Sequence, residues 1–326
     1  MLGWSKNFPL GRKGPFFVRT FTIPLTPPYS FERLLQRLQT HPDPQLEVQP
    51  EHNMLRRIFR VGTRPVLTRV QFVGELEQPA LKIETASALS AAEQRELERT
   101  IRHVFSADLD LLPIYEQMRE EPELAVLVDR FSGLRLMHDS DLFQSMVKTI
   151  IGQQINLTFA ANLTQRLLTL AGEEVADEQG VKFLAFPTAE DVARLSTEDL
   201  RPLQFSQRKA EYIIDYARAI VDGKVDLERL WAMEDEEIIA HLTPLRGIGR
   251  WTVECLLMFG MGRPNLLPAA DIGLRNGIAL VYKMDNKPDE REIRRIGERW
   301  APWRSIYSLY IWEAVGAVKR KEVWEE

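Results

Sequence analysis

The stretch LRGIGRWT, residues 245–252, decides how the fold is interpreted. EEIIAHL leads into it and WTVECLLMF leads out, so the pattern predicts two helices joined by a tight turn. Gly247 and Gly249 permit positive φ angles and lack Cβ atoms, which lets the backbone approach a partner closely. The first N–H groups of the second helix have no partner inside that helix, and the helix dipole makes them attractive to an anion.

Three side chains add to this anion site. Arg246 and Arg250 supply positive charge, and Thr252 supplies a hydroxyl near the start of the second helix. The alternative is a simple packing corner in which both glycines only end a helix. The hairpin residues by themselves leave both interpretations open.

The composition bounds the class of protein. The chain has 326 residues, enough for two or three domains, and 44% hydrophobic with 27% charged residues is typical of globular proteins. Cys255 is the single cysteine, which excludes an internal disulfide and any all-cysteine zinc or iron–sulfur site. We expect no metal site from the scattered histidines, which are His41, His52, His103, His138 and His241.

Net charge and hydropathy limit which cellular location and which binding partners we expect for the protein. The net charge of −5 disfavours a broadly basic nucleic-acid surface, although backbone amides and a few arginines can still bind phosphates. No apolar run approaches the ~18–20 residues of a membrane span. The N-terminus has charges but no continuous apolar core, so we expect a cytoplasmic protein without membrane contact.

Residues 1–111 are expected to form an α+β domain with helices packed on an antiparallel sheet. Ser30 is a candidate N-cap for an early amphipathic helix. The expected strands are 16–23, 54–61, 65–74 and 79–86, and the expected helices are 30–40 and 90–105.

Residues 112–326 are expected to be all-α, with two helical subdomains on either side of a cleft. Apolar periodicity predicts helices at 141–152 and 157–172, and a last long helix begins near residue 305. The acidic, Gly- and Pro-punctuated residues 173–190 are expected to be a surface connection. The expected fold is therefore mainly α with an N-terminal α+β domain.

Downstream of the hairpin, LLPAADIGLR (266–275) places Asp271 in a loop before another helix. A hairpin followed by a loop aspartate some twenty residues later resembles the helix-hairpin-helix superfamily of DNA base-excision glycosylases. IIGQQINLTFAANLTQRL, QRKAEYIIDYARAIVDGKVDLERL and ERWAPWRSIYSLYIW are similar to further segments of that family. The most similar branch is the AlkA-like DNA-3-methyladenine glycosylase II type. The resemblance covers residues 112–320 well and the N-terminal part more weakly.

The resemblance implies a monofunctional DNA glycosylase. Such an enzyme flips alkylated purines of the 3-methyladenine or 7-methylguanine type out of duplex DNA. It hydrolyses the N-glycosidic bond and leaves an abasic site for base excision repair. The implied partner is double-stranded DNA with damaged bases, bound by a monomer. No cofactor is implied beyond a monovalent cation that hairpin carbonyls of the family can hold.

The family pattern implies roles for five DNA-binding residues. Gly247, Gly249, Arg250 and Thr252 fall where the hairpin holds the phosphate backbone. Gln154 falls where a side chain enters the DNA and fills the gap left by the flipped nucleotide. The usual wedge is apolar, so Gln154 departs from the family. Its amide can still fill space and hydrogen-bond the orphaned base.

Asp271 is the candidate catalytic residue. Bond cleavage develops oxocarbenium character, which a nearby carboxylate stabilises, and the same group can orient or deprotonate water. The alternative is a structural N-cap of the helix IGLRNGIALVY. Both roles can hold at once, because an N-cap fixes the position of the carboxylate.

Trp251 bears on the reaction type. In the oxidised-base branches of the family, a lysine at this position forms a Schiff base, so tryptophan predicts no strand cleavage. Its ring can stack on a cationic alkylated base. Trp312 and Cys255 are further pocket candidates, although the family often has an aromatic residue where Cys255 stands. The alternative for Trp312 is core packing, as expected for the stripe of Trp303, Tyr307 and Tyr310.

Two other functions remain open from the sequence. One is a sister glycosylase for oxidised or deaminated bases, which Trp251 opposes. The other is a helix-hairpin-helix DNA-binding module without chemistry, which Asp271 opposes.

Overall fold

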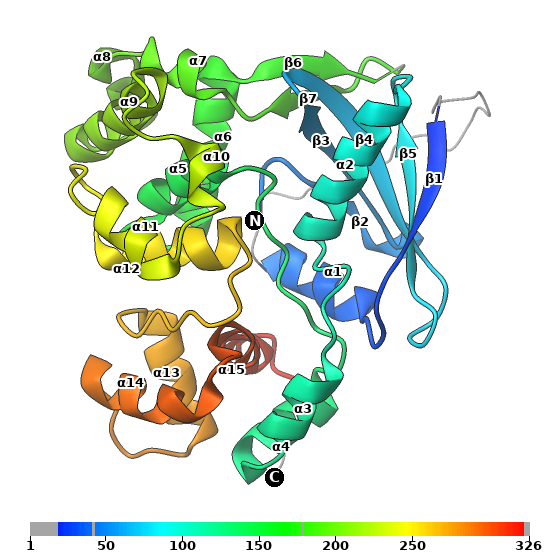
Figure 1. Cartoon of the computed structure of the whole chain (residues 1–326), viewed down its shortest axis with the longest axis vertical. Coiled ribbons are helices and arrows are strands. Elements are labelled where there is room, and N and C mark those ends of the chain that lie inside the picture. Colours follow the sequence, from blue (N-terminus) through cyan, green and yellow to red (C-terminus); the bar gives the residue numbers. More distant parts are fainter. Residues whose placement is uncertain (1–18, 41–42, 178, 323–326) are drawn as a thin grey trace.

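The computed structural model describes residues 19–40, 43–177 and 179–322. Its N-terminal unit is a five-stranded antiparallel sheet with strand order β1-β5-β4-β3-β2 and two longer helices (Figure 1). The elements are β1 (Arg19–Pro24), α1 (Phe31–Thr40), β2 (Glu47–Gln49), η1 (Pro50–His52), β3 (Met54–Val61), β4 (Arg64–Val73), β5 (Ala80–Thr85) and α2 (Ala91–Val104). The expected α+β unit is present. Residues 16–18 of the first expected strand lie outside the described residues.

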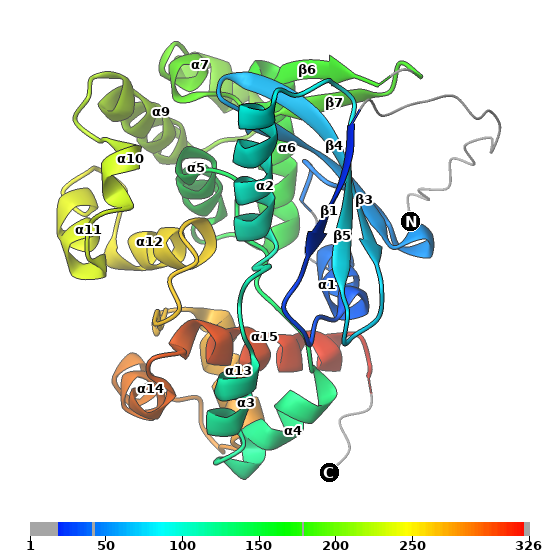
Figure 2. The same cartoon turned by 45° about the vertical axis from the view of Figure 1, so that its right-hand side comes forward.

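Alternation along the strands explains how the sheet buries both faces. Phe59 of β3 pairs with Val66 of β4, and both pack against the core that α1 and α2 cover (Figure 2). The next pair, Ile58 with Leu67, points to the opposite face and joins a separate small cluster. The sheet is therefore covered on both sides.

The rest of the described chain is mainly helical. Its elements are α3 (Leu112–Met118), α4 (Pro122–Arg130), α5 (Leu142–Gly152), α6 (Leu157–Ala171), β6 (Glu173–Ala176), β7 (Lys182–Ala185), α7 (Ala189–Ala193), α8 (Thr197–Leu200), η2 (Arg201–Leu203), α9 (Gln207–Val221), α10 (Leu227–Leu230), α11 (Asp235–Leu242), α12 (Arg250–Cys255), the π-helical η3 (Leu256–Gly260), α13 (Ile272–Val281), α14 (Glu290–Gly297), η4 (Glu298–Trp300) and α15 (Arg304–Lys319). Figure 1 shows two groups, α5–α12 above and α3, α4 and α13–α15 below. The mainly α fold with an N-terminal sheet is as expected.

The expectation of an all-α region is wrong at residues 173–190, the expected surface connection, which is largely exposed but contains two strands. Strands β6 and β7 form an antiparallel hairpin there. Val175 and Phe183 pack against the small cluster of Ile58 and Leu67, on the sheet face that α1 and α2 leave open. Two acidic residues of this segment also have partners in β3, because Arg60 pairs with Glu173 at 3.1 Å and Arg56 pairs with Asp177 at 2.9 Å. The short strands are thus stabilised by contacts with the N-terminal unit.

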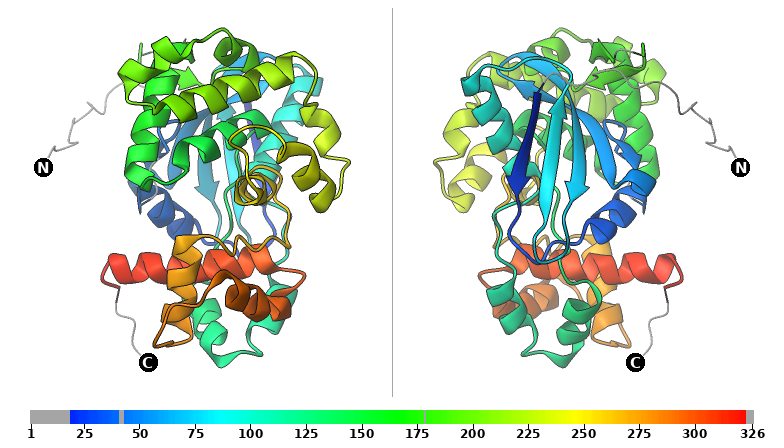
Figure 3. Two further views of the ribbon diagram at one scale, coloured as in Figure 1. Left: turned by 90° about the vertical axis from the view of Figure 1, so that its left-hand side faces the viewer. Right: turned by 90° about the vertical axis from the view of Figure 1, so that its right-hand side faces the viewer.

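Helix ends are set by local chemistry. Ser90 caps α2 in a capping box with Glu93, and Asp141 and Asn156 cap α5 and α6 through their side chains. Ser30, the expected N-cap, accepts a hydrogen bond from the Arg33 N–H at 3.3 Å. In both views of Figure 3, α15 lies beneath the end of the sheet, where it contacts α1.

Candidate active site

The two hairpin glycines differ in their backbone conformation and in the space around them. Gly247 has φ = 83°, and a Cβ at this position would overlap the ring of Tyr212. Gly249 has an ordinary φ of −94°, and a Cβ there would meet nothing within 4 Å. Both glycines permit positive φ, but only Gly247 uses it, and at Gly249 the missing Cβ leaves the backbone open to a partner. Position 247 needs glycine because its φ is positive and because the Tyr212 ring leaves no room for a Cβ. At position 249 the space beside the backbone is open.

That open space lies at the start of α12, where Gly249 is the N-cap. The Gly249 carbonyl accepts from the Val253 N–H at 3.2 Å, which closes the first turn. The N–H groups ahead of it point out of the helix, as they do at any helix start. An anion can reach these groups beside Gly249 without meeting a side chain of that residue.

Both arginines of the hairpin are half or more exposed and already engaged with carboxylates. Arg250 contacts Glu236 at 2.5 Å and the buried Glu254 at 3.1 Å. Arg246 contacts Glu211 at 2.5 Å. These hydrogen bonds lower the pKa of Glu236 and contribute to the lowered pKa of Glu211. A phosphate would have to compete with these carboxylates for the guanidinium groups.

Thr252 does not offer its hydroxyl at the surface. The side chain is buried, and its Oγ1 accepts a hydrogen bond from Nε2 of Gln153 at 3.1 Å. The same amide donates to the Gly247 carbonyl at 3.0 Å. The expectation that this hydroxyl adds to the anion site is therefore not supported. Its observed role is to connect the hairpin to Gln153, a residue that the sequence analysis missed although it adjoins Gln154.

Gln154 is exposed in the turn between α5 and α6, with φ = 58°. This turn is held by Lys209 of α9, whose Nζ donates to the carbonyls of Ile150, Ile151 and Gln153 at 3.0, 2.8 and 2.6 Å. Desolvation lowers the pKa of Lys209 to about 8. The exposed Gln154 is therefore carried on a turn that α9 and the hairpin both hold in place.

Asp271 is the N-cap of α13, so the structural role expected for it as an alternative is present. Its Oδ1 accepts from the Leu274 N–H at 2.7 Å and from Nε1 of Trp312 at 2.9 Å. Among the described residues, Oδ2 accepts no hydrogen bond. A Cβ at Gly273 would lie 3.0 Å from Oδ1, so this glycine makes room for the carboxylate. The carboxylate is held by one oxygen and free at the other.

Trp312 lies beside Asp271 and outside the buried aromatic stripe. Tyr307 and Tyr310 are buried in the main core, as expected for them. The half-buried Trp312 also packs against this core, as its alternative predicts, and it stacks on Phe259 of η3, with centroids 5.9 Å apart and planes at 26°. Phe259 is a further residue that the sequence analysis did not single out.

Cys255 and Trp251 belong to α12 and approach the same place. Burial raises the pKa of the Cys255 thiol, and the negative charge of Asp271 raises it further. Trp251 is half-buried one helical turn before Cys255, on the same side of the helix. Side chains of α12, η3, α13 and α15 thus converge around Asp271.

Among the described residues, no group of three or more His, Cys, Asp or Glu side chains could hold a metal ion. No helix in this part of the chain has the length and apolar character to cross a bilayer.

Comparison with known proteins agrees with this architecture. Residues 147–302 match the HhH-GPD superfamily of base excision DNA repair proteins, and residues 20–140 match the AlkA N-terminal domain. The candidate DNA-3-methyladenine glycosylase YfjP of Bacillus subtilis is 37% identical over 294 residues, which is 90% of this chain and 98% of the relative.

Two solved structures are similar as well. The 3-methyladenine DNA-glycosylase of Archaeoglobus fulgidus has a TM-score of 0.78 at 27% identity, over 90% of this chain and 97% of that one. The 3-methyladenine DNA glycosylase Mag1 of Schizosaccharomyces pombe, solved with abasic DNA, has a TM-score of 0.55 at 26% identity, over 62% and 95%. The chain therefore belongs to the HhH-GPD superfamily of base excision DNA repair proteins, in its AlkA-like branch.

Proposed function

We propose that the protein is a monofunctional DNA glycosylase that removes alkylated purines, of the 3-methyladenine and 7-methylguanine type, from double-stranded DNA. The observation that carries this proposal is the Asp271 carboxylate, fixed at Oδ1 and open at Oδ2, in a chain whose hairpin can bind a phosphate. The names of the relatives support the same substrate class.

Asp271 supplies the chemistry. As the bond between base and sugar stretches, positive charge develops on the sugar, and a fixed carboxylate stabilises it without rearranging. The free Oδ2 can also orient or deprotonate the attacking water. An alkylated purine with a positive charge is already a good leaving group, so no strong general acid is needed.

The base is recognised by aromatic and apolar groups around Asp271. Trp251 on α12 and Trp312 on α15 offer ring faces, and a ring face attracts a cation. Cys255 adds a small, uncharged wall, because burial and Asp271 keep its thiol protonated. This environment favours a flipped base that is flat and cationic.

DNA is held at two other points. The N-terminal amides of α12 beside Gly249 bind a backbone phosphate, and Arg250 exchanges its exposed partner Glu236 for the DNA while it keeps the buried Glu254. Gln154 enters the duplex from its turn and fills the gap left by the flipped nucleotide. We infer that the protein works as a monomer and that a monovalent cation binds hairpin carbonyls. Because the Thr252 side chain is buried, only the backbone N–H of Thr252 contributes to phosphate binding.

Trp251 accounts for the absence of strand cleavage in this proposal. A glycosylase that also cuts the strand uses an amine to form a Schiff base with the sugar. The side chain at the start of α12 that would supply this amine is an indole.

The test is incubation with duplexes carrying a single 7-methylguanine, 1,N6-ethenoadenine or hypoxanthine. Free base should appear, and the backbone should stay intact until alkali treatment. Nicking by the protein alone would contradict monofunctional action. Release of hypoxanthine without release of 7-methylguanine would favour a glycosylase for deaminated bases. Binding without release from any lesion would leave only a DNA-binding module.

A further inference from the structure

Phe259 has no role in the function as proposed so far, although it touches the active site. It belongs to η3, a π-helical segment directly after the hairpin helix α12. Single π-helical turns are rare and occur often at functional sites. The Phe259 side chain is half-buried and lies parallel to the ring of Trp312. This position is the result of several contacts from outside η3.

The backbone of η3 is anchored at its end by two donors. The Phe259 carbonyl accepts from the Asp139 N–H at 2.8 Å. The Gly260 carbonyl accepts from Nε2 of His103 at 2.8 Å, and His103 lies on α2 of the N-terminal unit. These bonds satisfy carbonyls at a helix end, where none is available from the helix itself. They also fix where the Phe259 ring can lie.

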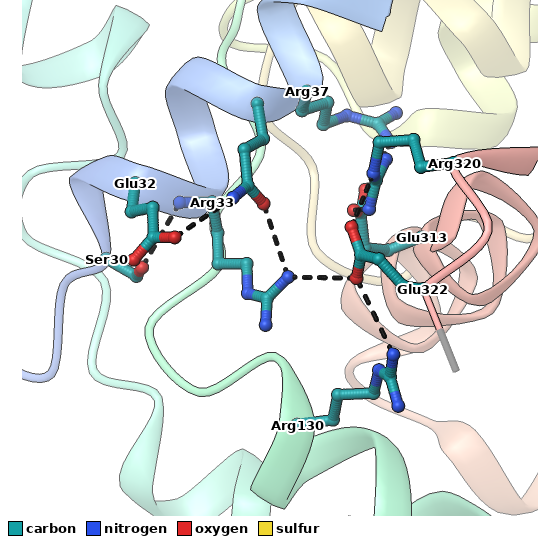
Figure 4. A network of polar contacts seen from close by, with 9 residues as sticks. Ser30, Glu32, Arg33, Arg37, Arg130, Glu313, Arg320 and Glu322 are labelled. Atoms are coloured by element: carbon teal, nitrogen blue, oxygen red, sulfur yellow. Dashed lines mark hydrogen bonds and ion pairs between the residues drawn. The ribbon is translucent and has the colours of Figure 1, made fainter. Parts of the chain in front are cut away.

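Trp312 is anchored by the same N-terminal unit. The next residue, Glu313, is fully buried and pairs with Arg37 of α1 at 3.3 Å and with Arg320 at 2.6 Å (Figure 4). A buried carboxylate is costly unless it keeps its partners. This network therefore fixes the rotation of α15 at the turn that carries Trp312.

The spacing between the Phe259 and Trp312 rings limits where a flipped base can bind. A base inserted between them would need about 6.8 Å, twice the 3.4 Å rise of stacked bases. The ring centroids are 5.9 Å apart. Phe259 therefore occupies one face of Trp312, and a flipped base cannot insert between the two rings. At the same time the indole N–H points at Oδ1 of Asp271.

We propose that Phe259 is a positioning residue for Asp271 that acts through Trp312, and that the N-terminal unit holds it in place through His103. The proposal rests on the proposed function, in which Asp271 is the catalytic residue. It assigns a role in catalysis to the α+β unit, which contributes two anchors next to the two stacked rings.

The test compares Phe259→Leu with Phe259→Tyr, which keeps the ring. The first readout is the ¹⁵N-labelled indole N–H signal of Trp312, assigned by its loss in Trp312→Phe. Phe259→Leu should shift this signal and speed its exchange with water, while Phe259→Tyr should leave it near the wild-type position. This readout needs no substrate, so it tests the positioning role even if the protein releases no alkylated base.

The second readout is the single-turnover rate of 7-methylguanine release. Phe259→Leu should lower it about ten-fold, because small displacements of a catalytic group are costly. Its affinity for abasic-site DNA should stay unchanged, and Phe259→Tyr should retain the rate. An unshifted indole signal or an unchanged rate in Phe259→Leu would overturn the proposal.

The link to the N-terminal unit is tested separately at His103. His103→Leu removes the donor to Gly260, and His103→Gln keeps a donor of similar reach. The leucine variant should shift the Trp312 indole signal in the same direction as Phe259→Leu, and the glutamine variant should not. Equal spectra for His103→Leu and the wild type would show that α2 does not hold the rings.

Discussion

The hairpin and the surroundings of Asp271 are built in opposite ways. At the hairpin, half-exposed arginines contact surface carboxylates, and the space beside Gly249 is open. Around Asp271, donors and rings from α13, α15 and η3 meet and are held by anchors from other elements. This difference fits the proposed function, in which binding uses groups that can exchange partners and the chemistry uses a carboxylate fixed before the substrate arrives.

The largest effect is expected at Asp271. Asp271→Asn should lower the single-turnover rate of base release by about a hundredfold or more, because the negative charge is lost. Asparagine is as good an N-cap as aspartate, so α13 and thermal stability should be retained. Affinity for abasic-site DNA should also remain. Turnover near the wild-type rate would refute the catalytic role.

A loss of folding stability is expected at Gly247. Gly247→Ala forces an alanine into positive φ and against Tyr212, and should cost about 1–3 kcal/mol in urea unfolding. The matched control is Gly223→Ala, because Gly223 has φ = 72° and nothing within 4 Å of its Cβ position. The difference between the two variants measures the Tyr212 contact. Equal losses would show that Tyr212 does not constrain the hairpin.

Smaller effects are expected at Arg250. Arg250→Ala should weaken DNA binding severalfold. It should also reduce the slope of the logarithm of the binding constant against the logarithm of the salt concentration by about one. Glu236→Gln should strengthen binding, because it removes a carboxylate that competes with phosphate for Arg250. Arg194→Ala is a matched control, since Arg194 is an exposed arginine that pairs with Asp191 at the end of α7 and not at the hairpin. No change in salt dependence for Arg250→Ala would contradict phosphate contact.

The sequence predicts the parts of the site that come from local patterns. The helix–Gly–helix pattern predicted the hairpin, apolar periodicity predicted most helices, and the position of Asp271 before a helix predicted its N-cap, while its catalytic role stays a prediction. Contacts between distant segments were not predictable. Glu173 and Glu174 are exposed, as their charge indicates, but their spacing does not reveal that this segment is a strand or that Arg60, far away in the chain, lies opposite Glu173.

The same limit applies inside the site. Nothing in the pattern around Phe259 indicates that its ring lies on Trp312, because the two residues are brought together by the packing of η3 and α15. Likewise, Thr252 is near the start of a helix, and only the structure shows that its hydroxyl is taken by Gln153. Residue type and spacing do not reveal which side of a hairpin faces the protein.

The most direct test of the division between binding and chemistry is a protein titration of single-turnover base release. Gly249→Asn places an amide in the open space and lets it cap the α12 amides, which should weaken DNA binding and preserve the fold. At saturating protein, Gly249→Asn should reach the wild-type rate of 7-methylguanine release, whereas Asp271→Asn should stay slow at every concentration. A Gly249→Asn plateau as low as that of Asp271→Asn, or recovery of Asp271→Asn at high protein concentration, would contradict the account.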